Sequence, residues 1–127
     1  MSSDKIKKAG EVIQALLVTI APSYYVAAPI DIIDALYIVY NFTGTEPADT
    51  KDMDQGTILY RFEVTVWASD MTQAVTKSSD MIDLLHNRSG TSSTIDYSIK
   101  YVDQYDDFNV GNNLYGKSVD FSIRCND

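Results

Sequence analysis

Carboxylates are the most abundant side chains of this sequence that could carry chemistry, and many of them gather in two runs. The first run holds Asp49, Asp52 and Asp54, and the second holds Asp103, Asp106 and Asp107. Paired carboxylates can act as a general acid and base, or they can bind a divalent cation. Neither run has the alternating aspartates, central glycine and terminal glutamate of an EF-hand calcium loop. Divalent-ion binding by the two runs therefore stays open, and acid–base catalysis gains no further support.

Other nucleophiles and metal ligands are scarce. His86 is the single histidine and falls at the end of an expected helix, where an imidazole interacts favourably with the helix dipole. Cys125 is the single cysteine, so the chain can form no internal disulfide bond, and its position is typical of a packing thiol. The sequence contains no glycine-rich phosphate loop, zinc motif or nucleophile elbow. We therefore predict no catalytic residue, no cofactor and no defined metal site.

Aromatic side chains point instead to contacts with other proteins. Nine tyrosines are more than one small core requires. Several, together with the single tryptophan, fall in expected loops or on the wetter faces of expected strands: Tyr24, Tyr25, Tyr37, Tyr105 and Trp67. Amphipathic rings at such positions suit protein–protein contacts, and packing within the core is the alternative. With the acidic runs, they give the candidate subunit and partner contacts Tyr37, Glu46, Asp49, Asp52, Asp54, Trp67, Tyr105, Asp106, Asp107 and Phe108.

Length and charge narrow the class of protein. The 127 residues predict a single domain, residues 1–127, large enough to bury a core without disulfides or metal. Eighteen acidic residues against ten basic ones give a formal net charge of −8. Such a surface argues against binding to nucleic acid or to an anionic membrane. No apolar run is long enough to span a bilayer, so we expect a cytosolic protein or one assembled in a cytosol.

A strand that leads directly into a helix, residues 56–86, should position the rest of the chain. The strand's apolar residues alternate on one face: Ile58, Tyr60, Phe62, Val64 and Val66. That alternation predicts a long antiparallel strand with one buried face. From Asp70 the apolar spacing becomes helical, and Asp70 with Gln73 resembles a capping box. Gly90 is available for a left-handed turn after this helix.

The remaining elements complete an α+β domain. We expect an N-terminal helix capped by Ser3 or Asp4 and ending near Pro22. Further strands are expected over residues 36–42, 94–102 and 114–124, the last with Lys117 as the one charged residue on its buried face. Residues 43–55 and 103–113 should be long acidic loops. The prediction is an antiparallel sheet of about four strands packed with two helices, in the order α-β-β-α-β-β.

One segment of the sequence resembles a known family. It runs Arg61-Phe-Glu-Val-Thr-Val-Trp-Ala-Ser-Asp70 and continues into a helix whose apolar stripe includes Ala74, Val75, Met81, Ile82 and Leu85. The segment is similar to the tail-completion and tail-terminator proteins of long-tailed bacteriophages, including head–tail joining proteins. The N-terminal helix, the strand at Tyr37-Ile-Val-Tyr40 and two C-terminal strands extend the likeness along most of the chain. The stretch Ile30-Asp-Ile-Ile-Asp34 departs from the short approach to the first strand expected in that family.

The resemblance implies a structural virion protein of the phage tail or neck, with no enzymatic activity. Such a protomer forms a homohexameric ring that terminates the tail tube and joins it to the head connector. Its partners would be other copies of itself, the tail tube protein and head-completion or connector proteins, and DNA would pass through without specific binding. It would be assembled in the host cytoplasm. The alternatives are a small acidic protein-binding or regulatory module, and an enzyme whose sites are shared between subunits.

Overall fold

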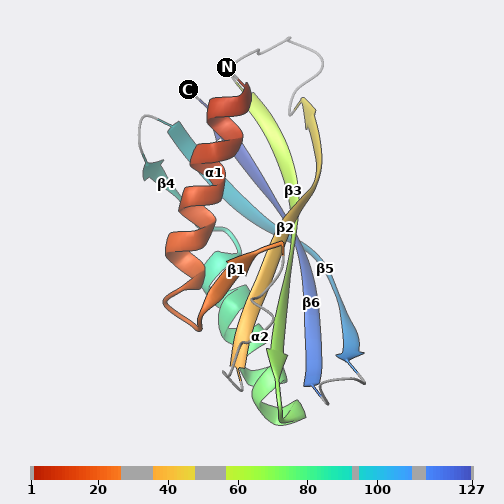
Figure 1. Ribbon diagram of the computed structural model, residues 1–127. Coiled ribbons are helices and arrows are strands. Elements are labelled where there is room, and N and C mark those ends of the chain that lie inside the picture. Colours follow the sequence, from red (N-terminus) through yellow and green to blue (C-terminus); the bar gives the residue numbers. More distant parts are fainter. Residues whose placement is uncertain (1, 27–35, 48–56, 93–94, 110–113, 127) are drawn as a thin grey trace.

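A computed structural model of the chain describes residues 2–26, 36–47, 57–92, 95–109 and 114–126 (Figure 1). These residues form two helices and six strands. In chain order these are α1 (Ser2–Leu17), β1 (Ser23–Tyr25), β2 (Leu36–Pro47), β3 (Thr57–Ala68), α2 (Met71–Leu85), β4 (Ser89–Ser92), β5 (Ile95–Asn109) and β6 (Leu114–Asn126).

The strands form one strongly twisted, curled sheet in the order β1-β2-β3-β6-β5-β4 (Figure 1). The pairing of β1 with β2 is parallel, and all the other pairings are antiparallel. The predicted four-stranded antiparallel sheet is therefore wrong. The sheet is mixed and six-stranded, and the order of elements is α-β-β-β-α-β-β-β.

The two unpredicted strands are short and lack apolar alternation. Strand β1 follows Pro22 directly and is three residues long. Strand β4 contains only serine, glycine and threonine, and it is held by backbone pairing to β5. The left-handed turn expected at Gly90 lies at Asn87, with φ 62°, and Gly90 instead pairs with Tyr97. Backbone hydrogen bonds rather than side-chain burial define these edge strands, so periodicity could not reveal them.

Both long strands run further than their alternation indicated. Residues 103–109 were expected in a loop, yet they continue β5 and pair with β6 as far as Asn109 opposite Leu114. Residues 43–47 likewise continue β2 opposite β3. A register shift interrupts each strand, between Phe42 and Gly44 in β2 and between Tyr101 and Asp103 in β5. A bulge resets the two-residue period, so the strand continues although its sequence pattern breaks.

Both helices lie on one face of the sheet (Figure 1), and the apolar stripe predicted for α2 is confirmed in part: Ala74, Met81 and Leu85 are buried, whereas Val75 is exposed. In α1, Ala9, Val12, Ile13 and Leu17 are buried. The helix begins at Ser2, so Ser3 and Asp4 lie in its first turn rather than at a cap, and it ends at Leu17, ahead of Pro22. Among the described residues, no helix has the length and apolarity needed to cross a membrane.

Helix α2 begins where the sequence predicted. The Asp70 carboxylate accepts the backbone N–H of Thr72 at 2.9 Å, which confirms the N-cap. Ala74, Ser78, Met81 and Leu85 face the sheet and are buried. His86 ends the helix, and its Nδ1 accepts the backbone N–H of Tyr101 at 2.9 Å. This contact ties the helix end to β5.

The core lies between the helices and the face of the sheet that they cover. At its centre Phe62 stacks on Phe121, with ring centroids 5.4 Å apart and an interplanar angle of 20°. Tyr60, Phe62, Val64 and Val66, predicted to face inward on β3, are confirmed as buried. On β6, Val119, Phe121 and Ile123 are buried as well. Cys125 is also buried in this cluster, as expected of a packing thiol.

Candidate interaction surface

The face of the sheet opposite the two helices, called here the open face, carries most of the described candidate contacts. It is formed by the residues that alternate with the core: Tyr37, Val39 and Asn41 on β2, Arg61, Glu63, Thr65 and Trp67 on β3, Gly116, Ser118, Asp120 and Ser122 on β6, and Asp103 and Tyr105 on β5. The strand pairings align these side chains in rows across the sheet. The open face is therefore a polar and aromatic surface built on rigid strands.

Aromatic rings pack along one end of the open face. Tyr37 lies opposite Trp67 in the β2–β3 ladder, and the Trp67 ring packs against Gly116 on β6. Tyr24 on β1 meets Tyr37 edge to face, with ring centroids 6.4 Å apart. Tyr37 is only 6% exposed, and Trp67 is half-buried. Much of this aromatic surface is therefore buried by packing within the chain itself.

Polar contacts continue the surface toward β5. The Tyr105 hydroxyl donates a hydrogen bond to Oε2 of Glu63 across β6, which lies between their strands. Tyr105 remains 43% exposed. Beside it, the hydroxyls of Thr65 and Ser118 form a buried hydrogen bond of 2.8 Å. These contacts fix the rotamers of a surface that the sequence shows only as alternating polar residues.

Three carboxylates form one row across the open face: Glu63, Asp120 and Asp103 occupy neighbouring positions on β3, β6 and β5. Partial burial raises the pKa of the Asp120 carboxyl above its ordinary value, the charge of Asp103 raises it further, and Arg61 acts in the opposite direction. The row concentrates negative charge on the sheet. Within the described part of the chain, no group of three or more histidine, cysteine, aspartate or glutamate residues is placed to hold a metal ion.

Asp106 lies on the other face of the sheet. Its carboxylate accepts a hydrogen bond from Nζ of Lys117 at 2.7 Å, and the two residues are register partners on β5 and β6. This pair explains how Lys117 occupies a core-facing position near the sheet's end: its side chain is only 17% exposed but is neutralised by the 70%-exposed Asp106. The sequence marked both residues and gave no sign that they pair.

The other predicted contacts are only partly located. Glu46 pairs with Leu59 in the backbone of β2, and Asp107 and Phe108 pair with Gly116 and Tyr115 in that of β5, while their side chains lie outside the described set. Asp49, Asp52 and Asp54 lie outside the described residues altogether. The structure thus brings Tyr37, Trp67 and Tyr105 onto one surface and puts Asp106 on the opposite face.

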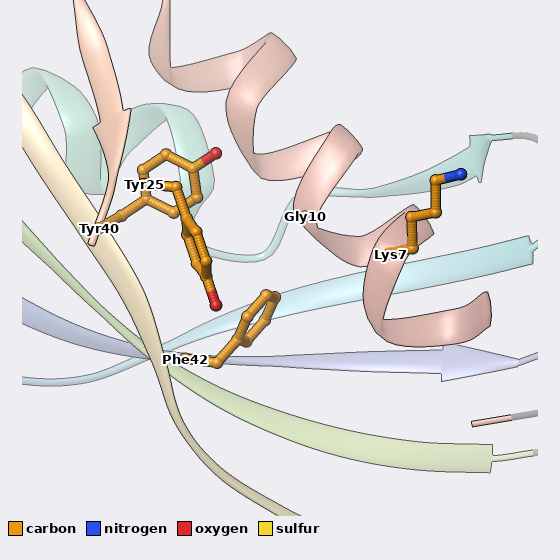
Figure 2. Close-up of a pocket in the computed structure, with 5 residues that line it drawn as sticks. All are labelled: Lys7, Gly10, Tyr25, Tyr40 and Phe42. Carbon is orange, nitrogen blue, oxygen red and sulfur yellow. The ribbon is translucent and has the colours of Figure 1, made fainter. Parts of the chain in front are cut away.

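A groove on the helix side was missed by sequence reasoning. It has a volume of about 240 Å³ and lies between α1 and the strands β1 and β2, lined by Lys7, Gly10, Tyr25, Tyr40 and Phe42. Figure 2 shows the three rings gathered on the strand side, facing the turn of α1 that carries Gly10. The Tyr40 hydroxyl donates to Oε1 of Gln14 at 2.6 Å, which fixes the inner wall. The only feature of the sequence that could have indicated this groove was Gly10, a small residue among the apolar positions of α1.

Comparison with known proteins supports the fold and identifies no family for the sequence. No known protein family matches the sequence, and no match to a characterised protein sequence was found. The structure is similar to a chain in the solved structure described as "Virion of native gene transfer agent (GTA) particle", with a TM-score of 0.65. The match covers 89% of this chain and 86% of that chain at 14% sequence identity. At this identity the likeness shows a shared fold.

Proposed function

We propose that this protein is a structural component of a bacteriophage virion, in the tail or neck, with no enzymatic activity. The observation that carries the proposal is the shared fold with a chain of a gene transfer agent virion, which extends over nearly all of both chains. The segment from Arg61 to Leu85, which resembles phage tail-terminator proteins, folds as most of β3, an interior strand of the sheet, and all of α2.

The finer proposal is a homohexameric ring that terminates the tail tube and joins it to the head connector. A ring closes through heterologous contacts, in which one surface of a subunit meets a different surface of its neighbour. A net charge of −8 suits a ring through which DNA passes without specific binding, because carboxylates do not attract phosphates. The partners would be further copies of the chain, the tail tube protein and the head-completion or connector proteins.

The exposed candidate contacts fit such an assembly. Tyr105 and Asp106 project from opposite faces of β5, and both are exposed. Tyr37 and Trp67 are more enclosed and would support the contact surface rather than form its rim. We assign Tyr105 and Asp106 to contacts between subunits or with the adjoining virion proteins.

Mass measurement and imaging of the purified full-length chain test this proposal. Light scattering after size-exclusion chromatography should give the mass of six subunits, and negative-stain images should show rings with six-fold symmetry. When the rings are added to polymerising tail tube protein, they should stop tube growth and sit at one tube end. A strictly monomeric protein that leaves tube growth unchanged would contradict the proposal.

A small acidic protein-binding module is the second candidate. The exposed carboxylate of Asp103, on the part of β5 beyond its pairing with β4, favours it because it suits a basic partner. This candidate predicts a monomer in the same measurements. It also predicts one-to-one binding to a single basic protein, with an affinity that falls steeply as salt is added.

A further inference from the structure

The sheet ends in two strand edges that the described pairings leave open. On one side, the pairing of β1 with β2 stops at Tyr25 opposite Tyr40, while β2 continues to Pro47. On the other side, β4 and the segment just before it, from His86, lie beside β5 only as far as Tyr101, whose N–H donates to His86. Strand β5 continues beyond this point to Asn109. Among the described residues, none pairs with Asn41–Pro47 or Val102–Asn109 on these outer sides. Such segments are templates for an added strand.

The β2 edge adjoins the apolar groove of Figure 2. Tyr40 and Phe42 point from β2 to the helix side, and Tyr25 closes the end where β1 stops. A strand added beside β2, where β1 leaves off, would place a side chain over Phe42 and against Gly10. Lys7 lines the same groove. This edge therefore offers backbone groups, an apolar recess and positive charge together.

The β5 edge has the complementary character. Asp103 is exposed on it, Asp106 is exposed but bonded to Lys117, and Val102 is 46% exposed. A bulge at Val102 and a 2.8 Å bond from the Gln104 N–H to the Asp103 carboxylate shield this edge. Bulges and charges of this kind keep strand edges from pairing with unsuitable partners. A lysine of a partner can bind the Asp103 carboxylate in place of the Gln104 N–H and so free that N–H for strand pairing, whereas a second acidic edge cannot.

We infer that the β5 edge of one subunit pairs with the β2 edge of the next copy, so that one sheet runs through neighbouring subunits of the ring. This interface rests on the proposed ring and names the surfaces that build it. The strand directions agree: β2, β3, β6 and β5 are successively antiparallel, so a neighbour in the same orientation meets β5 with an antiparallel β2. The helices of both subunits then lie on the same side.

The positions of the two edges also fit a closed ring. In Figure 1 the open part of β2 lies at the top of the sheet, and the open part of β5 lies at the bottom. Neighbouring subunits are therefore offset along the strand direction. In a closed sheet whose strands tilt relative to the ring axis, as in β-barrels, neighbouring subunits can be offset along the strands and still lie at the same height along that axis. A two-fold contact of β5 with β5 would instead bring acidic edges together.

Cross-linking tests the pairing directly. Thr43 and Gln104 are exposed on the two edges, and Cys125 is buried in the core. The full-length protein carrying both Thr43→Cys and Gln104→Cys, treated with a short bismaleimide, should give a ladder of covalent multimers on a denaturing gel. Each single variant should give none. A covalent dimer from Gln104→Cys alone would overturn the inference in favour of a two-fold contact.

Two further variants separate this interface from the ring itself. Gly10→Leu fills the groove, and Gln104→Pro removes an outward N–H; both should lose the ring by light scattering while thermal unfolding stays cooperative. The matched controls Ala15→Leu, on the exposed side of α1, and Gln104→Ala should keep the ring. Rings that survive Gly10→Leu and Gln104→Pro would refute the inference and leave the proposed function standing. A wild-type protein that is monomeric would contradict both the inferred interface and the proposed ring.

Discussion

The six-membered ring of Trp67 packs against the backbone of Gly116, its cross-strand partner on β6. A Cβ atom at position 116 would lie 2.8 Å from Cζ3 and 2.9 Å from Cε3 of Trp67. Non-bonded carbon atoms prefer separations of about 3.5–4.0 Å, so a side chain at 116 cannot coexist with this ring position. The glycine is thus a packing requirement of the open face, set by one tryptophan rather than by backbone conformation.

We expect Gly116→Ala to destabilise the protein by about 1–3 kcal/mol, because overpacking forces the indole or the strand to move. Chemical denaturation followed by Trp67 fluorescence measures both the free energy of unfolding and the environment of the ring. Gly44→Ala is the matched control, since the nearest atom to its Cβ is the Arg61 Cδ at 4.0 Å. Equal effects of the two substitutions would show that the Trp67 ring does not occupy this position in solution.

Phe62→Ala should cost about 3–5 kcal/mol, through lost transfer free energy and the cavity left against Phe121. Phe62 is fully buried, and its stacked partner lies on the neighbouring strand β6. The free energy of unfolding from urea titration measures the loss, with the exposed Val75→Ala on α2 as control. A loss under about 1 kcal/mol would show that this face of β3 is not the core.

Periodicity predicted the parts of this fold that burial dictates. The alternation around Phe62 and the helical stripe around Met81 located β3 and α2, because the same side chains that form the pattern form the core. Strands β1 and β4 left no such trace, since hydrogen bonds to β2 and β5 hold them. Acidic composition suggested a loop after Val102, whereas pairing with β6 extends the strand. Edge pairing is a tertiary property that local composition does not encode.

The candidate surface was predictable only as a set of residue types. The sequence predicted Tyr37, Trp67 and Tyr105 to lie in loops or on the wetter faces of strands. All three lie on the open face, where Tyr37 is nevertheless buried, and the sequence did not indicate their partners. The contact of Trp67 with Gly116 and the bond of Tyr105 to Glu63 depend on register, which is set by the whole sheet. The groove beside Gly10 depends on the position of α1 over β2. None of these relationships is visible in one strand alone.

The buried hydroxyl pair on the open face gives a further test. Thr65 and Ser118 share a 2.8 Å hydrogen bond between β3 and β6. Thr65→Val should cost about 1–3 kcal/mol, because it leaves the Ser118 hydroxyl without this partner. Adding Ser118→Ala should cost less than the sum of the two single changes, and a double-mutant cycle measures the difference. Strict additivity would mean that the hydroxyls do not interact.

Asp120 should make the protein less stable at neutral pH than it would be with a neutral side chain. Burial, and then repulsion by Asp103, raise the pKa of the folded-state carboxyl, and Arg61 only partly opposes them. The folded protein therefore holds this proton more tightly than the unfolded chain does. As pH rises from the unfolded value, about 3.9, through the raised folded pKa, this group lowers the free energy of unfolding. Above that window the penalty is complete.

We therefore expect Asp120→Asn to stabilise the protein at pH 7 and to lose that advantage as pH falls below the unfolded pKa of aspartate, about 3.9. Urea denaturation of both proteins across the acidic range measures the difference in the free energy of unfolding, with Asp80→Asn, exposed on α2, as the control. The amide keeps the size of the side chain, so the pH dependence isolates the charge. An Asn variant whose advantage is the same at both ends of the range would show that burial and the charge of Asp103 do not raise the pKa of Asp120 in the folded protein.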